Sequence, residues 1–148
     1  MSKLYIPEDN DKLRLNYEKN GGGCCGPASI AAIIEKKVSN INLRWSELCG
    51  HRVLSQGWTS WKHMKLILES YGYECAQKPA HKSLFFPTPS GSDYYWAEAT
   101  MYTHFVAMKR IGDDWFVFCN ECGWFPRPEK WPYETPGYIT SYYELTKK

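Results

Sequence analysis

The feature that most constrains this chain is a glycine-rich loop that leads directly into an apolar segment. Residues 21–38 read GGGCCGPASIAAIIEKKV. Glycine adopts backbone angles that other residues avoid, so the loop can turn sharply, and Pro27 suits a first helical turn, where no backbone N–H is needed. The run that follows is almost entirely apolar up to Glu35. It predicts a helix over residues 26–37 that is buried on nearly all sides.

Cys25 falls at the predicted N-terminus of this helix. Unsatisfied backbone N–H groups and the positive end of the helix dipole stabilise a thiolate there, and the thiol pKa in such sites falls from ~8.5 into the range ~3.5–7.5. The interpretation that needs no chemistry is that Cys24 and Cys25 are small buried hydrophobes. A nucleophile therefore requires a second group elsewhere in the chain.

The composition favours one domain over residues 1–148 and excludes several kinds of partner. The formal net charge is +2 without a basic or acidic run, so we expect neither nucleic acid nor an anionic membrane surface as a partner. No apolar stretch approaches the ~20 residues of a membrane span, and the first residues lack the apolar core of a signal peptide. We therefore expect a cytoplasmic protein whose six cysteines are thiols, ligands or a nucleophile rather than disulfides.

The other predicted elements are shorter. A helix over residues 59–71 would begin at a Thr59 cap and end at Gly72. Its predicted buried face consists of Trp61, Met64, Leu68 and Tyr71. The remaining expectations are an extended segment (1–20), a short helix (41–50), a short strand (73–77), a loop (123–137) and an edge strand (138–145).

Residues 79–100 combine helix- and strand-breaking residues with aromatic side chains. Prolines, serines and a glycine interrupt any regular element, so we expect a long loop. Long loops in small domains are often functional, and we predict that Tyr94, Tyr95 and Trp96 line or cover a substrate-binding cleft. A lid that only covers the core is the alternative.

Residues 103–119 give the clearest strand pattern, with THFVAMKR and WFVFCN on either side of IGDD. They predict a β-hairpin that turns at Gly112 and Asp113. A two-residue loop places His104 opposite Glu121, and a loop one residue shorter places it opposite Asn120. In both registers Asn120 is a neighbour of His104, at the ~4.5–5.5 Å that separates cross-strand Cβ atoms. The amide oxygen of Asn120 could then accept the Nδ1 proton and leave Nε2 for the thiol, as in a nucleophilic triad.

Three segments together resemble the papain-like cysteine peptidases, with closest likeness to the bacteriocin-processing, double-glycine peptidases. They read CGPASIAAI, ESYGY and HFVAMKRIGDDWFVFCN, and the resemblance runs from about residue 23 to residue 120. It maps Cys25, His104 and Asn120 onto the family's catalytic triad. It implies an α+β fold, in which a helical layer carries the cysteine at a helix N-terminus and packs on an antiparallel sheet that carries the histidine and asparagine.

The resemblance also implies an activity. The expected reaction is cleavage of a peptide or isopeptide bond in a protein or peptide substrate through a thioester, with no cofactor and no metal. Small residues before the scissile bond are expected if the double-glycine likeness extends to specificity. Where the family has an oxyanion-binding glutamine, this chain has Lys19, so Asn16 or Asn20 is the candidate replacement.

Three alternatives use the same residues. Cys119-x-x-Cys122 has the spacing of zinc ligands, and Cys24, Cys25 or His104 could complete a tetrahedron. A peptidase-like scaffold can also serve as a binding module without chemistry. Acyl transfer to an amine instead of water would need the same triad as hydrolysis.

Overall fold

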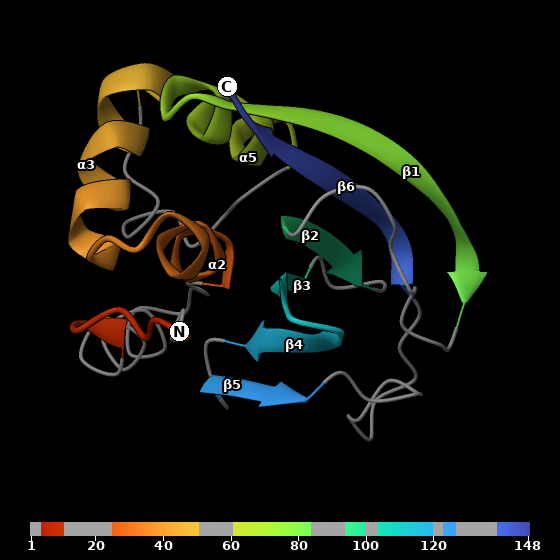
Figure 1. The fold of residues 1–148 in the computed structure, drawn as a ribbon. Coiled ribbons are helices and arrows are strands. Elements are labelled where there is room, and N and C mark those ends of the chain that lie inside the picture. Colours follow the sequence, from red (N-terminus) through yellow and green to blue (C-terminus); the bar gives the residue numbers. More distant parts are fainter. Residues whose placement is uncertain are drawn as a thin grey trace.

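The computed structural model describes residues 4–10, 25–50, 61–83, 94–99, 104–119, 123–126 and 139–148. Its described helices are α2 (Cys25–Ile34), α3 (Val38–Cys49) and α5 (Trp61–Ser70). Its described strands are β1 (Tyr73–Ser83), β2 (Tyr94–Ala99), β3 (His104–Ile111), β4 (Asp114–Cys119), β5 (Gly123–Pro126) and β6 (Ile139–Lys147). The helices form a layer beside one antiparallel sheet with the strand order β1-β6-β2-β3-β4-β5, which confirms the predicted α+β class (Figure 1).

Helix α2 is the central helix of this layer and packs against β3, β4, α3 and α5. Its residues from Gly26 to Ile33 are all buried, as the apolar sequence predicts. The helix ends at Ile34, three residues before the predicted end, because Glu35 adopts a left-handed conformation with φ 59°. The N–H of Lys36 then donates to the carbonyl of Ala31 at 3.1 Å. This is the bond of a Schellman C-cap, with Glu35 in the position that glycine usually occupies.

Helix α3 begins three residues earlier than predicted because a distant carboxylate caps it. Oδ1 of Asp9 accepts the Val38 N–H at 2.8 Å, and Oδ2 accepts the Ser39 N–H at 3.0 Å. Lys37, the residue at the N-cap position, forms no capping hydrogen bond through its own side chain. The first turn of α3 is therefore stabilised from a segment 29 residues away in the sequence.

Helix α5 buries the face that the sequence predicts. Met64, Ile67 and Leu68 are inaccessible to solvent. The chain leaves the helix at Gly72, which has φ 89°. Among the described helices, none has the combination of length and apolar character that crossing a membrane requires.

The predicted hairpin is confirmed. Ile111 pairs with Asp114 across a two-residue loop, and Ala107 pairs with Phe118 further along the ladder. Gly112 supplies the positive φ, 65°, that a tight hairpin loop requires at its first position. Of the two registers considered from sequence, the structure adopts the one with the two-residue loop.

Four expectations about strands were wrong. Part of the predicted loop 79–100 forms β2, which lies between β6 and β3 in the sheet. Strand β1 continues to Ser83 instead of ending at residue 77, and it tolerates Pro79 because an edge strand pairs on one side only. Part of the predicted loop 123–137 forms β5. Strand β6 is an interior strand between β1 and β2, and not an edge strand.

The hydrophobic core lies between the helical layer and one face of the sheet. Side chains alternate between the faces of a strand, and Phe105 and Ala107 of β3 point into this core. Val106 and Met108 alternate with them and are also fully buried, so β3 is covered on both faces. The largest fully buried side chains of the described residues are Trp45, Phe105, Phe118, Ile30, Ile41, Met64, Ile67, Leu68 and Met108.

Residues 4–10 lie beside the N-terminal end of α3 and β5 (Figure 1). The carbonyl of Tyr5 accepts a hydrogen bond from Nε1 of Trp124 in β5 at 2.6 Å, while Asp9 caps α3. This segment therefore connects the helical layer to the far edge of the sheet.

Candidate active site

Cys25 is the first residue of α2, the position that the sequence predicts for a nucleophile. The residue is partly exposed and packs against the hydrophobic core. One helical turn later, Oγ of the fully buried Ser29 donates to the carbonyl of Phe105 in β3 at 3.1 Å. This hydrogen bond fixes the first turns of α2 against the beginning of β3.

The beginning of β3 is where the sequence predicts the catalytic histidine. His104 is the first residue of the strand, directly before Phe105. The backbone of Phe105 also forms a hydrogen bond with the thiol of Cys25. The thiol thus lies next to the residue that follows His104. Nothing is described of the His104 side chain, so its contact with the thiol stays a prediction.

The end of β4 lies at the same place. Cys119, the last residue of β4, is fully buried, and its thiol is close enough to act electrostatically on that of Cys25. Asn120 follows Cys119 in the chain and falls outside the described residues, as do Asn16, Asn20 and Cys24. The described backbone thus brings the first residue of α2, the start of β3 and the end of β4 together.

The described surroundings of Cys25 do not by themselves favour a thiolate. Burial is the main cause that raises the pKa of its thiol to about 11, and the Cys119 thiol adds to the rise. Backbone hydrogen bonds at Phe105 and Gly26 act in the opposite direction but are weaker. The residue as a whole is partly exposed, so burial acts on the thiol end, which packs on the core. Desolvation therefore outweighs the helix terminus, and the predicted low pKa requires a further positive charge.

The predicted substrate-binding aromatic residues occupy β2. Tyr94 pairs with Lys109, whereas Ala99 pairs with His104, so Tyr94 is five residues, or about 17 Å, along the strand from the His104 pair. The Tyr94 ring packs on the core, contacts the ring of Tyr73 and lies under Nζ of Lys109. This gives Tyr94 a structural role. Tyr95 and Trp96 follow it in the strand, and contact of these three residues with a substrate stays a prediction.

The alternative zinc site would combine Cys119 and Cys122 with Cys24, Cys25 or His104. Within the described ranges, no three His, Cys, Asp or Glu side chains lie close enough together to hold a metal ion. Cys24 and Cys122 fall outside those ranges.

Two residues of the site, Ser29 and Phe105, were not identified from sequence. Ser29 is the hydroxyl within an otherwise apolar helical run, and a buried hydroxyl requires a hydrogen-bond partner. That requirement indicates a contact with another element, but it does not identify Phe105 as the partner.

A solved structure with a similar fold is the peptidase domain of Streptococcus ComA, described as a bifunctional ABC transporter involved in a quorum-sensing pathway. It aligns with a TM-score of 0.58 and 13% sequence identity, over 84% of this chain and 91% of that one. At this identity the similarity shows a shared peptidase-like fold. No protein-family model matches the chain, and neither does any curated protein.

Proposed function

We propose that this chain is a single-domain cysteine peptidase in which Cys25 is the nucleophile, His104 the general base and Asn120 the residue that orients His104. The observation that carries the proposal is the position of the Cys25 thiol. It lies at the start of a buried helix and forms a hydrogen bond with the backbone of the residue that follows His104. The peptidase-like fold supports the same assignment.

The reaction begins when Sγ of Cys25 attacks the carbonyl carbon of a peptide or isopeptide bond. His104 holds the thiol proton and gives it to the leaving amine as the C–N bond breaks, which leaves a thioester on Cys25. Water, deprotonated by His104, then attacks the thioester, releases the acid and returns the proton to the thiol. The backbone N–H of Cys25 and the amide of Asn16 or Asn20 would stabilise the oxyanion in both steps.

His104 has a second role in this proposal, because the environment of Cys25 disfavours its thiolate. Burial raises the thiol pKa to about 11, so a thiol in that environment stays protonated at neutral pH. An imidazolium at His104 would stabilise the thiolate through an ion pair, and the two groups would then titrate as a pair. The proposal therefore predicts that activation of Cys25 depends on His104 more strongly than on the helix terminus.

The proposal is tested with a peptide-like, thiol-reactive probe, intact-mass measurement and mapping of the modified residue. We expect one modification, at Cys25, that disappears in Cys25→Ala. Cys75→Ala is the matched control, because Cys75 is also a partly exposed thiol that packs on the core. Modification of another cysteine, or equal modification of all six, would contradict the assignment.

A second candidate function is a peptidase-like binding module that has no catalysis. The raised pKa of the Cys25 thiol favours it, because a protonated thiol is a weak nucleophile. A peptide that binds equally to the wild type and to Cys25→Ala, and that neither protein cleaves, would support this function over the peptidase.

A further inference from the structure

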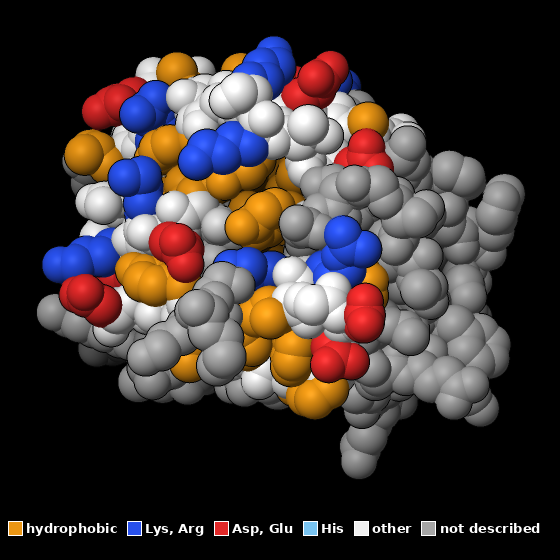
Figure 2. Space-filling model, viewed as in Figure 1, with side chains coloured by type: hydrophobic (Ala, Val, Ile, Leu, Met, Phe, Trp, Pro, Cys, Tyr) orange, Lys and Arg blue, Asp and Glu red, His pale blue; other side chains and the backbone are white. Residues whose placement is uncertain are grey.

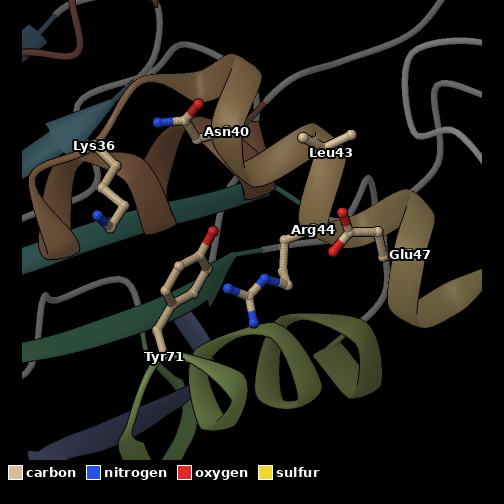
Figure 3. Close-up of a pocket in the computed structure, with 6 residues that line it drawn as sticks. All are labelled: Lys36, Asn40, Leu43, Arg44, Glu47 and Tyr71. Atoms are coloured by element: carbon tan, nitrogen blue, oxygen red, sulfur yellow. The ribbon is translucent and has the colours of Figure 1, made fainter.

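A pocket of about 240 Å³ lies on the helical layer, at the opposite end of α2 from Cys25. Lys36, Asn40, Leu43, Arg44, Glu47 and Tyr71 line it (Figure 3). Lys36 follows the end of α2, four of the residues belong to α3, and Tyr71 follows α5. Helix α2 has 10 residues and spans about 15 Å, so the pocket is separate from the candidate active site.

The Arg44 guanidinium is held in place by an aromatic ring. Its Cζ lies 4.6 Å from the centre of the Tyr71 ring, which is a cation–π contact. A cation–π contact occupies none of the five N–H donors of a guanidinium with a hydrogen-bond acceptor, so they can donate to other partners. Figure 3 shows the Tyr71 hydroxyl directed into the space between Lys36 and Arg44. Arg44 is thus positioned as a hydrogen-bond donor toward the pocket.

Lys36 is positioned by the backbone that precedes it. The left-handed Glu35 and the Lys36 N–H bond to Ala31 turn the chain out of α2 at this point. Lys37, the next residue, pairs with Glu8 at 3.6 Å, and Lys65 pairs with Glu69 at 3.8 Å. Within the described residues, Lys36 and Arg44 have no carboxylate at such a distance. Two cations therefore border the pocket without a counter-ion from this part of the chain.

The rest of the lining indicates the size and charge of a ligand. Lys36 and Arg44 together with Glu47 give a net charge of +1, which favours a monoanion over a dianion. Leu43 is 62% exposed and offers an apolar wall, while Asn40 adds an amide. On the face shown in Figure 2, basic and acidic side chains are interspersed over the described helical part. A polyanion such as nucleic acid requires a broader surface of one sign, so a small ligand fits better.

We propose that this pocket binds a small organic carboxylate. The carboxylate accepts hydrogen bonds from the edge of the Arg44 guanidinium and from Nζ of Lys36, and the organic part lies against Leu43. Arginine suits this role because its planar fork matches the geometry of a carboxylate. The site is independent of catalysis at Cys25.

The test is an NMR titration of the full chain with benzoate, with benzyl alcohol as the uncharged probe. We expect benzoate, and not benzyl alcohol, to shift the Arg44 side-chain Nε–Hε signal and the backbone signals of residues 36–47. Arg44→Gln should weaken benzoate binding by about tenfold, because it removes a charge-assisted pair of hydrogen bonds. Shifts of equal size with both probes, or an unchanged affinity in Arg44→Gln, would overturn the proposal.

Two further variants separate this site from general effects. Glu47→Gln should strengthen benzoate binding by about two- to threefold, because it removes the one acidic side chain of the lining. Loss of fold would weaken binding and could not strengthen it, so the opposite signs at Arg44 and Glu47 are diagnostic. Cys25→Ala should bind benzoate like the wild type, whether or not Cys25 is catalytic. A weaker interaction in Glu47→Gln would contradict the charge argument.

Discussion

Helix α2 begins in the core and ends at the surface, and the side chains at its two ends differ in burial and in chemical type. At the first end, the helix dipole favours an anion, whereas burial raises the pKa of the Cys25 thiol to about 11 and so disfavours the thiolate. At the second end, the residues that follow the last turn are exposed, and Lys36 lines a surface pocket together with Arg44. The difference teaches that desolvation opposes a charge at the buried end, so a thiolate there needs the partner that we propose in His104, whereas exposure removes this opposition at the other end.

The largest expected effect is at the buried end. His104→Ala should slow alkylation of Cys25 by iodoacetamide at pH 6 by roughly 1000-fold. A thiol pKa of about 11 lowers the thiolate fraction at pH 6 by about 100,000-fold, and the greater nucleophilicity of that more basic thiolate offsets about 100-fold of the loss. The rate is measured by mass spectrometry of the Cys25 peptide over time. Asn120→Ala should slow it less, since the imidazolium is kept.

Cys49 is the control for this experiment, because burial raises the pKa of its thiol too and this last residue of α3 has no role in the proposal. Its slow alkylation should be the same in the wild type and in His104→Ala. If Cys25 reacts as slowly as Cys49 in the wild type, the two ends of α2 do not differ in the way proposed, and the binding module is favoured.

A smaller effect is expected where the exposed end of α2 continues into α3. Asp9→Ala should lower the free energy of unfolding by about 1–2 kcal/mol, because two N–H groups of the first turn of α3 lose their acceptor. Chemical denaturation measures this change. Glu8→Ala is the control, since its ion pair with Lys37 joins two exposed side chains and should contribute little.

The Asp9 cap also predicts a pH dependence. Burial raises the pKa of this carboxyl, but hydrogen bonds from the Ser39 and Val38 backbone outweigh it and hold the pKa below its ordinary value. The stabilisation is therefore fully present above the unfolded-state pKa of about 4 and is lost as the pH falls through the lower folded-state pKa. Asp9→Asn should remove this part of the acid sensitivity. An unchanged acid profile in that variant would show that Asp9 is not the titrating group.

The smallest effect is expected at Glu35. Glu35→Gly should raise the free energy of unfolding by about 0.5–1 kcal/mol, because glycine adopts the left-handed conformation without the steric cost that a side chain carries. Thermal unfolding should shift upward by a few degrees. Glu35→Ala removes the charge but keeps the Cβ, so it should give no such gain. An equal gain in both variants would point to the charge and not to the backbone.

The parts of the fold that sequence predicts are those that local chemistry determines. The turn at Gly112 sets the register of β3 and β4, and the apolar run after Pro27 sets the buried helix. Strand β2 was not predicted, because the prolines, serines and glycine before it indicate a loop. The interior position of β6 was not predicted, because it depends on pairing with β1 and β2, which are far away in the sequence. Local signals carry no information about such partners.

In the two sites, too, sequence predicts what local signals determine and misses what distant contacts determine. Sequence places Cys25 at a helix start, and the structure confirms that position. The low thiol pKa that the sequence predicts with a His104 partner stays a prediction, because burial alone raises the pKa of the Cys25 thiol. The pocket on the helical layer was not identified, although Lys36, Asn40 and Arg44 recur every four residues. That spacing shows a shared face within a helix, but Lys36 lies before α3, and Tyr71 follows α5, far from α3 in the sequence.

The hydrogen bond between Tyr5 and Trp124 has a consequence for the order of folding. It joins residues that are 119 positions apart, so it closes one of the longest loops that the chain can form. Closing such a loop costs more entropy than forming the β3–β4 hairpin, whose strands are adjacent. During synthesis, the segment that contains Tyr5 leaves the ribosome long before its partner strand exists. We therefore expect this segment to be among the last to dock, after the sheet has formed an edge for it.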